Sequence, residues 1–467
     1  MPVVLWTDAL IFLLLAAMAA YFWYVRRHEH LAAPWRRVAA SSVGMSALVV
    51  LLAFIAVGLI DSLHFRPRLA QPGAGGEDVH AVQVLSLLDE LARGLRSRAE
   101  RTYSAPLATR AYSKEMLELA DGTQVRDFPR LAHGGAHLKD ESGRSRDILA
   151  RCLAALALAL ACWGVLAAVL AAALARRSRA RFGDTWRALL GARTRVPWRA
   201  MLITAGVLLA VAFPAAALSA RYHVLGTDKV GQDVLYLALK SIRTGLVIGT
   251  LTTLVMLPLS VLLGIMAGYF RGWIDDLIQY AYTTLNSIPA VLLIAAAVLM
   301  VQVQIDTHPE LFPTAAQRAD LRLLFLCIIL GLTSWTGLAR LLRGEALKLR
   351  ELEYIQAAHA FGVSHARIIT RHILPNVMHL VLIALVMDFS GLVLAEAVLS
   401  YVGVGVDPST ISFGTMINAA RMEMAREPMV WWALLAAFTF MFVMVLAANL
   451  FADAVRDAFD PRLRMGN

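Results

Sequence analysis

Long apolar runs constrain this chain of 467 residues more than any other feature of its sequence. Each run is about as long as the helix that a bilayer requires, and unpaired backbone groups are too costly in hydrocarbon for irregular structure. With 59% hydrophobic and 17% charged residues, the composition excludes an ordinary soluble domain. We therefore predict an all-α polytopic membrane protein. The predicted spans lie at about 6–25, 39–60, 148–175, 200–219, 240–268, 277–302, 321–341, 377–402 and 430–452.

The arginines predict the topology of these spans. Arg26 and Arg27 follow the first run, whereas a secretory signal would carry its positive charges before it. A dense basic cluster follows the third run. It comprises Arg176, Arg177, Arg179, Arg181, Arg187, Arg193, Arg195 and Arg199. A nucleic-acid patch is the alternative, but basic loops beside membrane spans remain in the cytoplasm. With the N-terminus outside, nine crossings place every basic loop and the C-terminus inside.

Four regions follow from this pattern. Residues 1–61 supply two N-terminal transmembrane helices, and residues 62–147 form a polar external (periplasmic) insert. Residues 148–198 hold the third transmembrane helix and its basic cytoplasmic loop, and residues 199–467 hold the remaining spans. Within the insert, apolar residues recur at helical spacing and predict one amphipathic helix. These residues are Val84, Leu87, Leu88, Leu91 and Leu95.

No metal site or catalytic set is indicated. Glycines separate His133 from His137, and the three cysteines form no CxxC pair. The sequence also lacks the G-x-x-x-x-G-K-[ST] loop that cradles ATP phosphates. A membrane-anchored enzyme or sensor that uses the insert at 62–147 stays open as an alternative function.

The polar stretch Glu345–Asn376 separates two apolar runs and carries small residues at helical spacing. Ala357, Ala358 and Gly362 leave one face of a short helix almost without side chains, so a partner backbone can approach it closely. We expect Gly362 to end this helix and Ser364 to cap a second one, which Leu374-Pro375-Asn376 then stops.

This stretch resembles the cytoplasmic coupling loop of ABC importer permeases, in the dipeptide/oligopeptide/nickel branch. The resemblance implies that an ATPase subunit docks on the loop. By this resemblance, the residues expected to couple to the ATPase are Tyr354, Ala357, Ala358, Phe361, Gly362, Ser364, Arg371, His372 and Pro375.

A second motif, His223-Val-Leu-Gly-Thr-Asp-Lys-Val-Gly-Gln-Asp-Val234, lies between the fourth and fifth runs. Gly226 and Gly231 permit tight turns, which Asp228 and Asp233 can hold through side-chain bonds to the backbone. Ion contact at a channel mouth is the alternative. The motif resembles the external HxLGTDxxGxDV segment of the same branch, although glutamine stands where the family usually has arginine.

Polar residues within the apolar runs are candidates for a transport pathway. Acidic groups in hydrocarbon are costly, so Asp388 and Glu396 face either a polar path or a hydrogen-bonded protein interior. Asn286-Ser287-Ile288-Pro289 also resembles a family motif, in which the proline is expected to kink the sixth span. Together the pathway candidates are Asn286, Ser287, Asp388, Ser390 and Glu396.

The resemblance runs roughly from Arg199 to the end of the chain. It implies a six-helix ABC importer permease core of the C-type membrane subunit, with about three extra N-terminal transmembrane helices. It also implies a bacterial inner-membrane complex with a second homologous permease, two ABC ATPase subunits and an extracytoplasmic solute-binding protein. ATP and Mg would then be bound by the partner subunits, and this chain would carry no cofactor and perform no catalysis. The cargo (dipeptide, oligopeptide, peptide antibiotic or nickel chelate) stays open.

The topology is directly testable. We predict that Arg176–Arg199 and Glu345–Asn376 share the cytoplasmic side and that residues 62–147 lie opposite, because basic loops are retained inside. Cysteines introduced singly into a chain without its native cysteines can be labelled in intact cells. Labelling of Arg187→Cys by an impermeant external reagent would rule out the nine-span topology.

Overall fold

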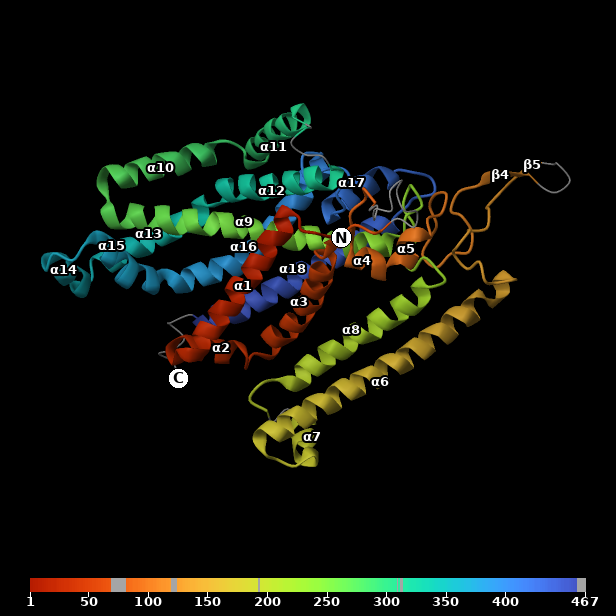
Figure 1. Cartoon of the computed structure of the whole chain (residues 1–467), viewed down its shortest axis with the longest axis horizontal. Helices are drawn as coiled ribbons and strands as arrows, with labels where there is room; N and C mark the ends of the chain where they lie inside the picture. Colours follow the sequence, from red (N-terminus) through yellow and green to blue (C-terminus); the bar gives the residue numbers. More distant parts are fainter. Residues whose placement is uncertain (69–80, 119–123, 192–193, 309, 311–313, 460–467) are drawn as a thin grey trace, which may run out of the picture. The chain divides into compact units, whose positions relative to one another are not determined.

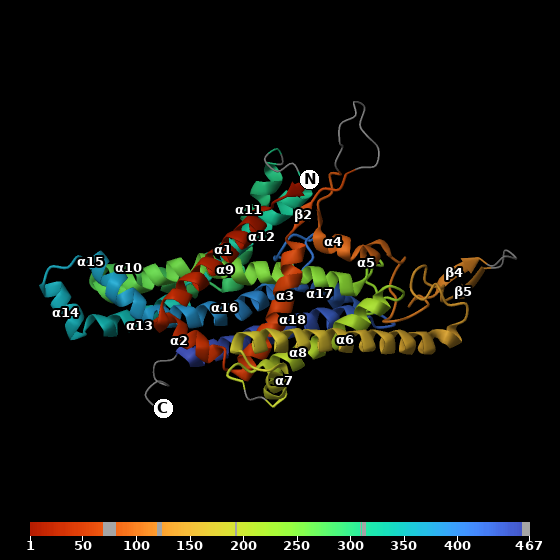
Figure 2. The same cartoon turned by 60° about the horizontal axis from the view of Figure 1, so that its bottom comes forward.

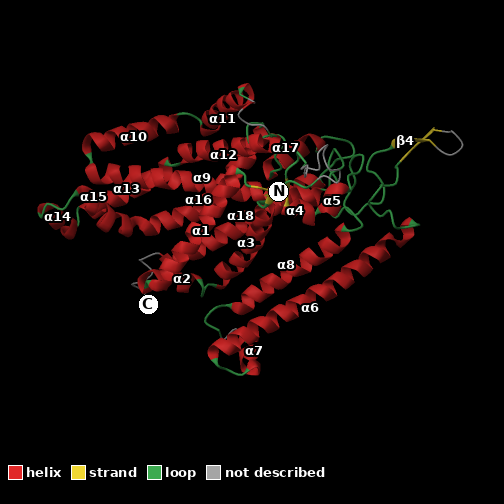
Figure 3. Cartoon of the chain, in the orientation of Figure 1, coloured by secondary structure: helices red, strands yellow, loops and turns green. Residues whose placement is uncertain are grey.

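The computed structural model describes all residues except 69–80, 119–123, 192–193, 309, 311–313 and 460–467. Helices account for most of the described chain, and the few strands are short (Figures 1 and 3). Among the described residues, nine helical segments are long and apolar enough to cross a membrane, which confirms the predicted all-α polytopic fold. They are Trp6–Arg27, Ser42–Asp61, Glu141–Ser178, Trp198–Ser219, Val234–Phe270, Ala290–Thr307, Ala315–Arg350, His365–Val402 and Trp432–Phe459.

The chain forms two compact units, which are described separately. The first comprises Met1–Val3, Arg36–Thr244 and Ile411–Leu450, and the second comprises Val4–Trp35, Gly245–Thr410 and Phe451–Asn467. Three helices contribute residues to both units. They are α2 (Glu29–Val38), α9 (Val234–Phe270) and α18 (Trp432–Phe459).

In the first unit, α8 (Trp198–Ser219) packs along α6 (Arg144–Ser178) and also contacts α3 (Ser42–Asp61) (Figure 2). Buried alanines recur on α6, which brings small side chains to its packed face as membrane helices favour. They are Ala155, Ala159, Ala167, Ala171 and Ala175. The short α7 (Phe182–Leu190) joins α6 to α8, and α17 (Phe413–Glu423) completes the helices of the unit.

The insert of the first unit combines short strands and short helices. Strands β1 (Pro2–Val3), β2 (His64–Phe65) and β3 (Leu85–Ser86) form an antiparallel sheet in that order, and β4 (Glu115–Glu118) pairs with β5 (Gln124–Asp127). The remaining helices are α4 (Leu87–Leu91), α5 (Arg93–Ser97) and the 3₁₀ turn η1 (Glu141–Gly143).

The amphipathic helix predicted from Val84 to Leu95 is confirmed only in part, because Leu87, Leu88 and Leu91 lie in α4 and Leu95 lies in α5, whereas Val84 precedes β3. Ser86 ends β3 and caps α4, since its hydroxyl accepts the Asp89 N–H and the Asp89 carboxylate accepts the Ser86 N–H. Asp89 also receives hydrogen bonds from Tyr236 and an ion pair from Lys240 on α9. These contacts fix the start of α4 at Leu87 rather than at Val84.

The second unit contains α1 (Trp6–Arg27) and the helices of the central chain. These are α10 (Gly272–Ser287), α11 (Ala290–Thr307), α12 (Ala315–Ser334), α13 (Thr336–Arg350), α14 (Glu353–Ala360), α15 (His365–Ile368), the π-helical turn η3 (Ile369–Ile373) and α16 (Leu374–Val402). Near its start, α1 is tied to α12, because the Thr7 N–H donates to the Asp320 carboxylate at 3.2 Å. The core of the unit lies where α9, α13 and α16 pack together.

The structure changes two expectations about prolines. Pro289 does not kink one span over 277–302. Instead Ile288 is extended, as residues before proline prefer, so α10 ends and α11 begins as a separate helix. Pro375 does not stop a helix either. It lies in the first turn of α16, where no backbone donor is needed, and helical structure continues from His365 to Val402.

Candidate functional site

The predicted coupling loop contains a short helix that ends at the expected glycine. Gly362 has φ +73°, and its N–H donates to the His359 carbonyl at 3.0 Å. The Val363 N–H donates to the Ala358 carbonyl at 3.1 Å, which completes the paired bonds of a glycine-terminated helix. Ser364 precedes α15 with extended backbone, but its side chain makes no capping bond, so the predicted side-chain cap is absent.

Ile355 is the buried residue that anchors helix α14 to the core of the second unit. Ile355 is 2% exposed and packs into an apolar cluster built from α9, α13, α15, η3 and α16 (Figure 1). The other cluster members are Ile265, Tyr269, Leu338, Leu342, Ala346, Ile368, Ile373, Val377, Val381 and Ala384. A displacement of α14 would therefore move the residues of α9, α13 and α16 that pack against Ile355, because packed interiors transmit strain.

The outer face of α14 carries large apolar area next to small residues. The Phe361 side chain is 86% exposed and Tyr354 is 46% exposed. Ala357 and Gly362 are exposed as well, and a Cβ built on Gly362 would meet no atom within 4 Å. Ala358, however, is half-buried against the cluster, so the predicted small-residue face includes Ala357 and Gly362 but only part of Ala358.

Polar contacts hold the chain around α14. The Asn376 side-chain amide donates to the Tyr354 hydroxyl at 3.2 Å, and the rings of Tyr354 and His372 lie 6.0 Å apart. Arg371 and Pro375 are exposed. The predicted loop residues thus come together in one region at the end of α13 and the start of α16.

The pathway candidates lie on two helices and differ in exposure. Asn286 and Ser287 are exposed at the end of α10, where the Asn286 side-chain oxygen accepts from the Thr336 hydroxyl at 3.2 Å. On α16, Asp388 is half-buried, whereas Ser390 and Glu396 are buried. Glu396 is 1% exposed, and the Ser400 hydroxyl donates to its carboxylate at 2.7 Å.

The external motif has the turn geometry that its residues predict. Gly226 and Gly231 have φ +73° and +77°. One Asp228 oxygen accepts the N–H groups of residues 230 and 232 at 3.0 and 2.8 Å. One Asp233 oxygen accepts the Leu235 N–H at 2.8 Å at the start of α9. These aspartates therefore hold turns, as the structural interpretation of the motif requires.

A buried charged cluster links this motif to the insert, and sequence reasoning missed it. His223 is 3% exposed and lies between two carboxylates, with Nδ1 2.8 Å from Asp233 and Nε2 3.3 Å from Glu100. A Cβ on Gly231 would lie 1.9 Å from the Glu100 carbonyl oxygen, so the contact requires glycine. His223 is the first residue of the motif, but nothing in the pattern of the insert indicates Glu100 as its partner.

Contacts with two carboxylates determine the charge of His223 in this cluster. Burial by itself lowers the pKa of His223, but its hydrogen bonds to the Asp233 and Glu100 carboxylates outweigh this effect and raise the pKa to about 9. Burial alone would raise the pKa of Glu100, yet His223 and the N–H groups of residues 132–134 bring it down to about 2. At neutral pH the cluster is therefore an imidazolium held between two carboxylates.

Comparisons with known proteins identify the family of this chain. The model for "Binding-protein-dependent transport system inner membrane component" matches residues 260–465, which include the coupling loop. An oligopeptide transport system permease of Mycobacterium tuberculosis is 31% identical over 242 residues, covering 52% of this chain and 77% of the relative. The chain belongs to this family of transport permeases.

Two other relatives agree with the assignment. A glutathione transport system permease of Pectobacterium atrosepticum is 31% identical and covers 52% of this chain and 73% of the relative. A dipeptide transport system permease of Bacillus subtilis is 28% identical, and the match covers 52% of this chain and 69% of the relative. The permease is thus a multi-pass subunit of an ABC importer in the bacterial inner membrane. An enzyme or sensor built on the insert finds no support.

The shifted pKa values of His223 and Glu100 predict that the stability of the insert depends on pH. Because the pKa of His223 is raised from 6.5 to about 9, its contribution is complete below pH 6.5 and is lost as the pH rises towards 9. Glu100 contributes fully above pH 4.5, and its contribution is lost as the pH falls towards 2. The thermal unfolding temperature should therefore decrease as the pH is raised from 6.5 to 9.

The His223→Gln variant separates this effect from other titrations. It removes a stabilising contribution on the order of 3 kcal/mol, so it should melt below wild type at pH 6 and approach it at pH 9. The test compares the thermal unfolding temperatures of wild type and variant at pH 6 and pH 9, measured at one scan rate. A wild-type-to-variant difference that stays constant over this range would contradict the assignment of charge to His223.

Proposed function

We propose that the permease forms half of a translocation pathway for peptides or peptide-like solutes. The observation that supports this most directly is the similarity of the core to permeases named for oligopeptide, dipeptide and glutathione transport. A second homologous permease would supply the other half, and an extracytoplasmic solute-binding protein would deliver the cargo. The pathway candidates are Asp388, Ser390 and Glu396 on α16, with Asn286 and Ser287 on α10. Asp388, Asn286 and Ser287 are accessible for contact with the passing solute, whereas Ser390 and Glu396 are buried and would hold the helices that line the pathway.

ATP hydrolysis is assigned to partner subunits. Two ABC ATPases would bind ATP and Mg and dock on the exposed face of α14. Phe361 supports this proposal best, because an aromatic side chain that is 86% exposed at the end of a short, anchored helix is suited to a pocket on a partner. Ile355 then links the docked face to the cluster beneath, so movement of the ATPase can reach α9, α13 and α16.

The Gly362→Leu variant tests the docking face. A leucine there must adopt a positive φ, and its side chain points into space that the partner would occupy. Overfilling a packed interface costs roughly 1–3 kcal/mol, or about one to two decades in binding. We expect the variant to insert normally, to retain less ATPase on purification and to transport less.

Two control variants separate strain from docking. Gly403→Leu introduces the same side chain at φ +89°, also with no atom within 4 Å of the new Cβ, but at the opposite end of α16. Lys348→Leu changes a side chain that is 74% exposed on the approach to α14. Both should retain the ATPase. If Gly362→Leu co-purifies with as much ATPase as Lys348→Leu and transports normally, the loop is not the coupling element.

The substrate class is tested with the intact importer in proteoliposomes. We expect ATP-dependent uptake of labelled di- to oligopeptides, which falls to background when the binding protein is omitted. Uptake of a nickel chelate or a peptide antibiotic without uptake of peptides would assign a different cargo to the same pathway. Absence of any ATP-dependent uptake with the complete complex would refute the importer function itself.

A further inference from the structure

The turn that joins α6 to α8 is strongly basic. Residues 176–199 contain eight arginines and one acidic residue, Asp184. The seven described arginines are all exposed, and none takes part in an ion pair within the described part of the chain. They are Arg176, Arg177, Arg179, Arg181, Arg187, Arg195 and Arg199. Uncompensated charge of one sign at this density calls for an anionic partner.

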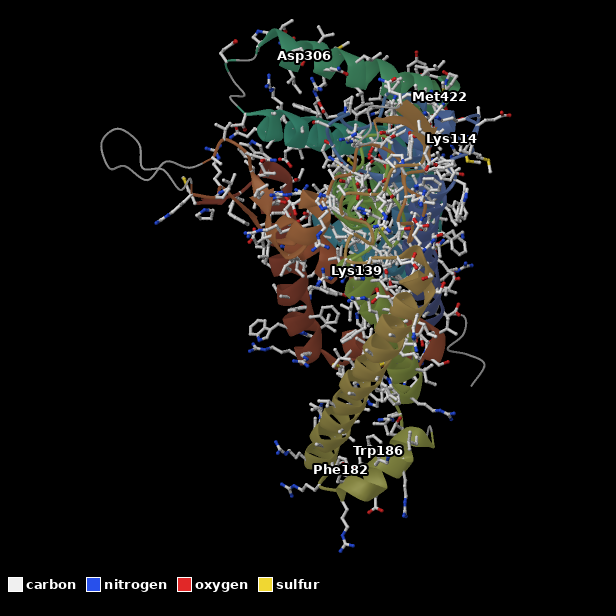
Figure 4. All side chains as sticks on the ribbon, turned by 90° about the vertical axis from the view of Figure 1, so that its right-hand side faces the viewer. Lys114, Lys139, Phe182, Trp186, Asp306 and Met422 are labelled. Atoms are coloured by element: carbon white, nitrogen blue, oxygen red, sulfur yellow. The ribbon has the colours of Figure 1, made fainter. Side chains whose placement is uncertain are left out.

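Helix α7 places apolar side chains among these arginines. Phe182 and Leu190 are 49% and 51% exposed, and Trp186 lies between them at helical spacing. The rings of Phe182 and Trp186 stack with centroids 5.9 Å apart (Figure 4). These residues form the apolar stripe of α7.

One edge of the apolar face of α7 is anchored to the helices that flank it. Leu189 is 1% exposed and packs with Ala167 and Ala171 of α6 and Leu202 of α8. Trp186 packs partly against the same cluster, so the orientation of α7 on the hairpin is determined by packing, and Phe182 and Leu190 of the apolar stripe remain exposed. Retention of a basic loop in the cytoplasm requires positive charge alone, so topology does not account for this outward-facing stripe.

The flanking helices determine what α7 meets. Both Glu141–Ser178 and Trp198–Ser219 are candidate membrane spans, so the chain between them lies at a membrane surface. A short helix with exposed aromatic and aliphatic residues beside arginines fits the boundary between lipid headgroups and acyl chains. Anionic lipids of the cytoplasmic leaflet also supply negative charges that can pair with the arginines.

We propose that the exposed arginines of residues 176–191 and 194–199 form a binding surface for anionic phospholipid headgroups of the cytoplasmic leaflet. The guanidinium groups bind lipid phosphates through paired N–H donors. The apolar stripe of α7 enters the acyl boundary. This surface belongs to the extra helices outside the family match, so it concerns membrane anchoring rather than cargo.

The test uses the full-length permease in mild detergent, with phosphatidylglycerol or phosphatidylcholine added. We expect phosphatidylglycerol to bind more tightly by native mass spectrometry and to raise the thermal midpoint further. Each arginine near an anionic surface contributes roughly fivefold in affinity. The triple variant Arg179→Gln/Arg181→Gln/Arg187→Gln should therefore bind phosphatidylglycerol on the order of 100-fold more weakly, while its four remaining described arginines keep the loop inside.

Two further variants make the test specific. Arg93→Gln/Arg101→Gln/Arg126→Gln removes the same charge from exposed positions of the insert and should leave phosphatidylglycerol binding unchanged. Phe182→Ser/Leu190→Ser keeps every arginine, and with them the topology, and should weaken phosphatidylglycerol binding several-fold.

Three results would overturn the proposal. The first is unchanged phosphatidylglycerol binding in both the arginine and the apolar variants. The second is equal stabilisation by soluble glycerol phosphate, which would indicate a site for free phosphate. The third is tighter binding of an RNA oligonucleotide than of the lipid, which would assign the surface to nucleic acid.

Discussion

Backbone hydrogen bonding in hydrocarbon is the constraint on which this structure depends. A peptide group inside a bilayer has no water to pair with, so each apolar run must satisfy its own N–H and C=O groups by forming a helix. The nine candidate spans follow from this requirement. Deviations from regular helix therefore need a local reason, and they occur at identifiable residues.

Three such deviations shape the second unit. Pro289 separates α10 from α11, a π-helical turn precedes Pro375, and Gly362 ends α14 with a positive φ. Gly362 and the π-helical turn lie on either side of α15, in the loop proposed to receive the ATPase. A short helix held by one buried residue, Ile355, can be displaced as a body because its ends are already free of continuous helix.

The first unit uses charge rather than helix breaks to hold its polar parts together. His223 lies between Glu100 in the insert and Asp233, the residue before α9, and Lys240 on α9 contacts Asp61 and Asp89. In each cluster, a cation before or within the first turns of α9 pairs with one acidic residue of the insert, Glu100 or Asp89. Since a buried charge without its partner is strongly destabilising, these clusters specify where the insert sits on that helix.

The sequence by itself determined the helical class, most of the spans and the polar loop between α13 and α16, because apolar length and small-residue spacing are local properties. It also predicted the turns at Asp228 and Asp233, whose side chains bond to backbone only a few residues away. Only the tertiary structure decided that Ala358 packs inward, that residues 84–95 divide at Ser86, and that Glu100 meets His223. Each of these depends on contacts between residues far apart in the chain, and no local periodicity encodes the partner that burial will supply.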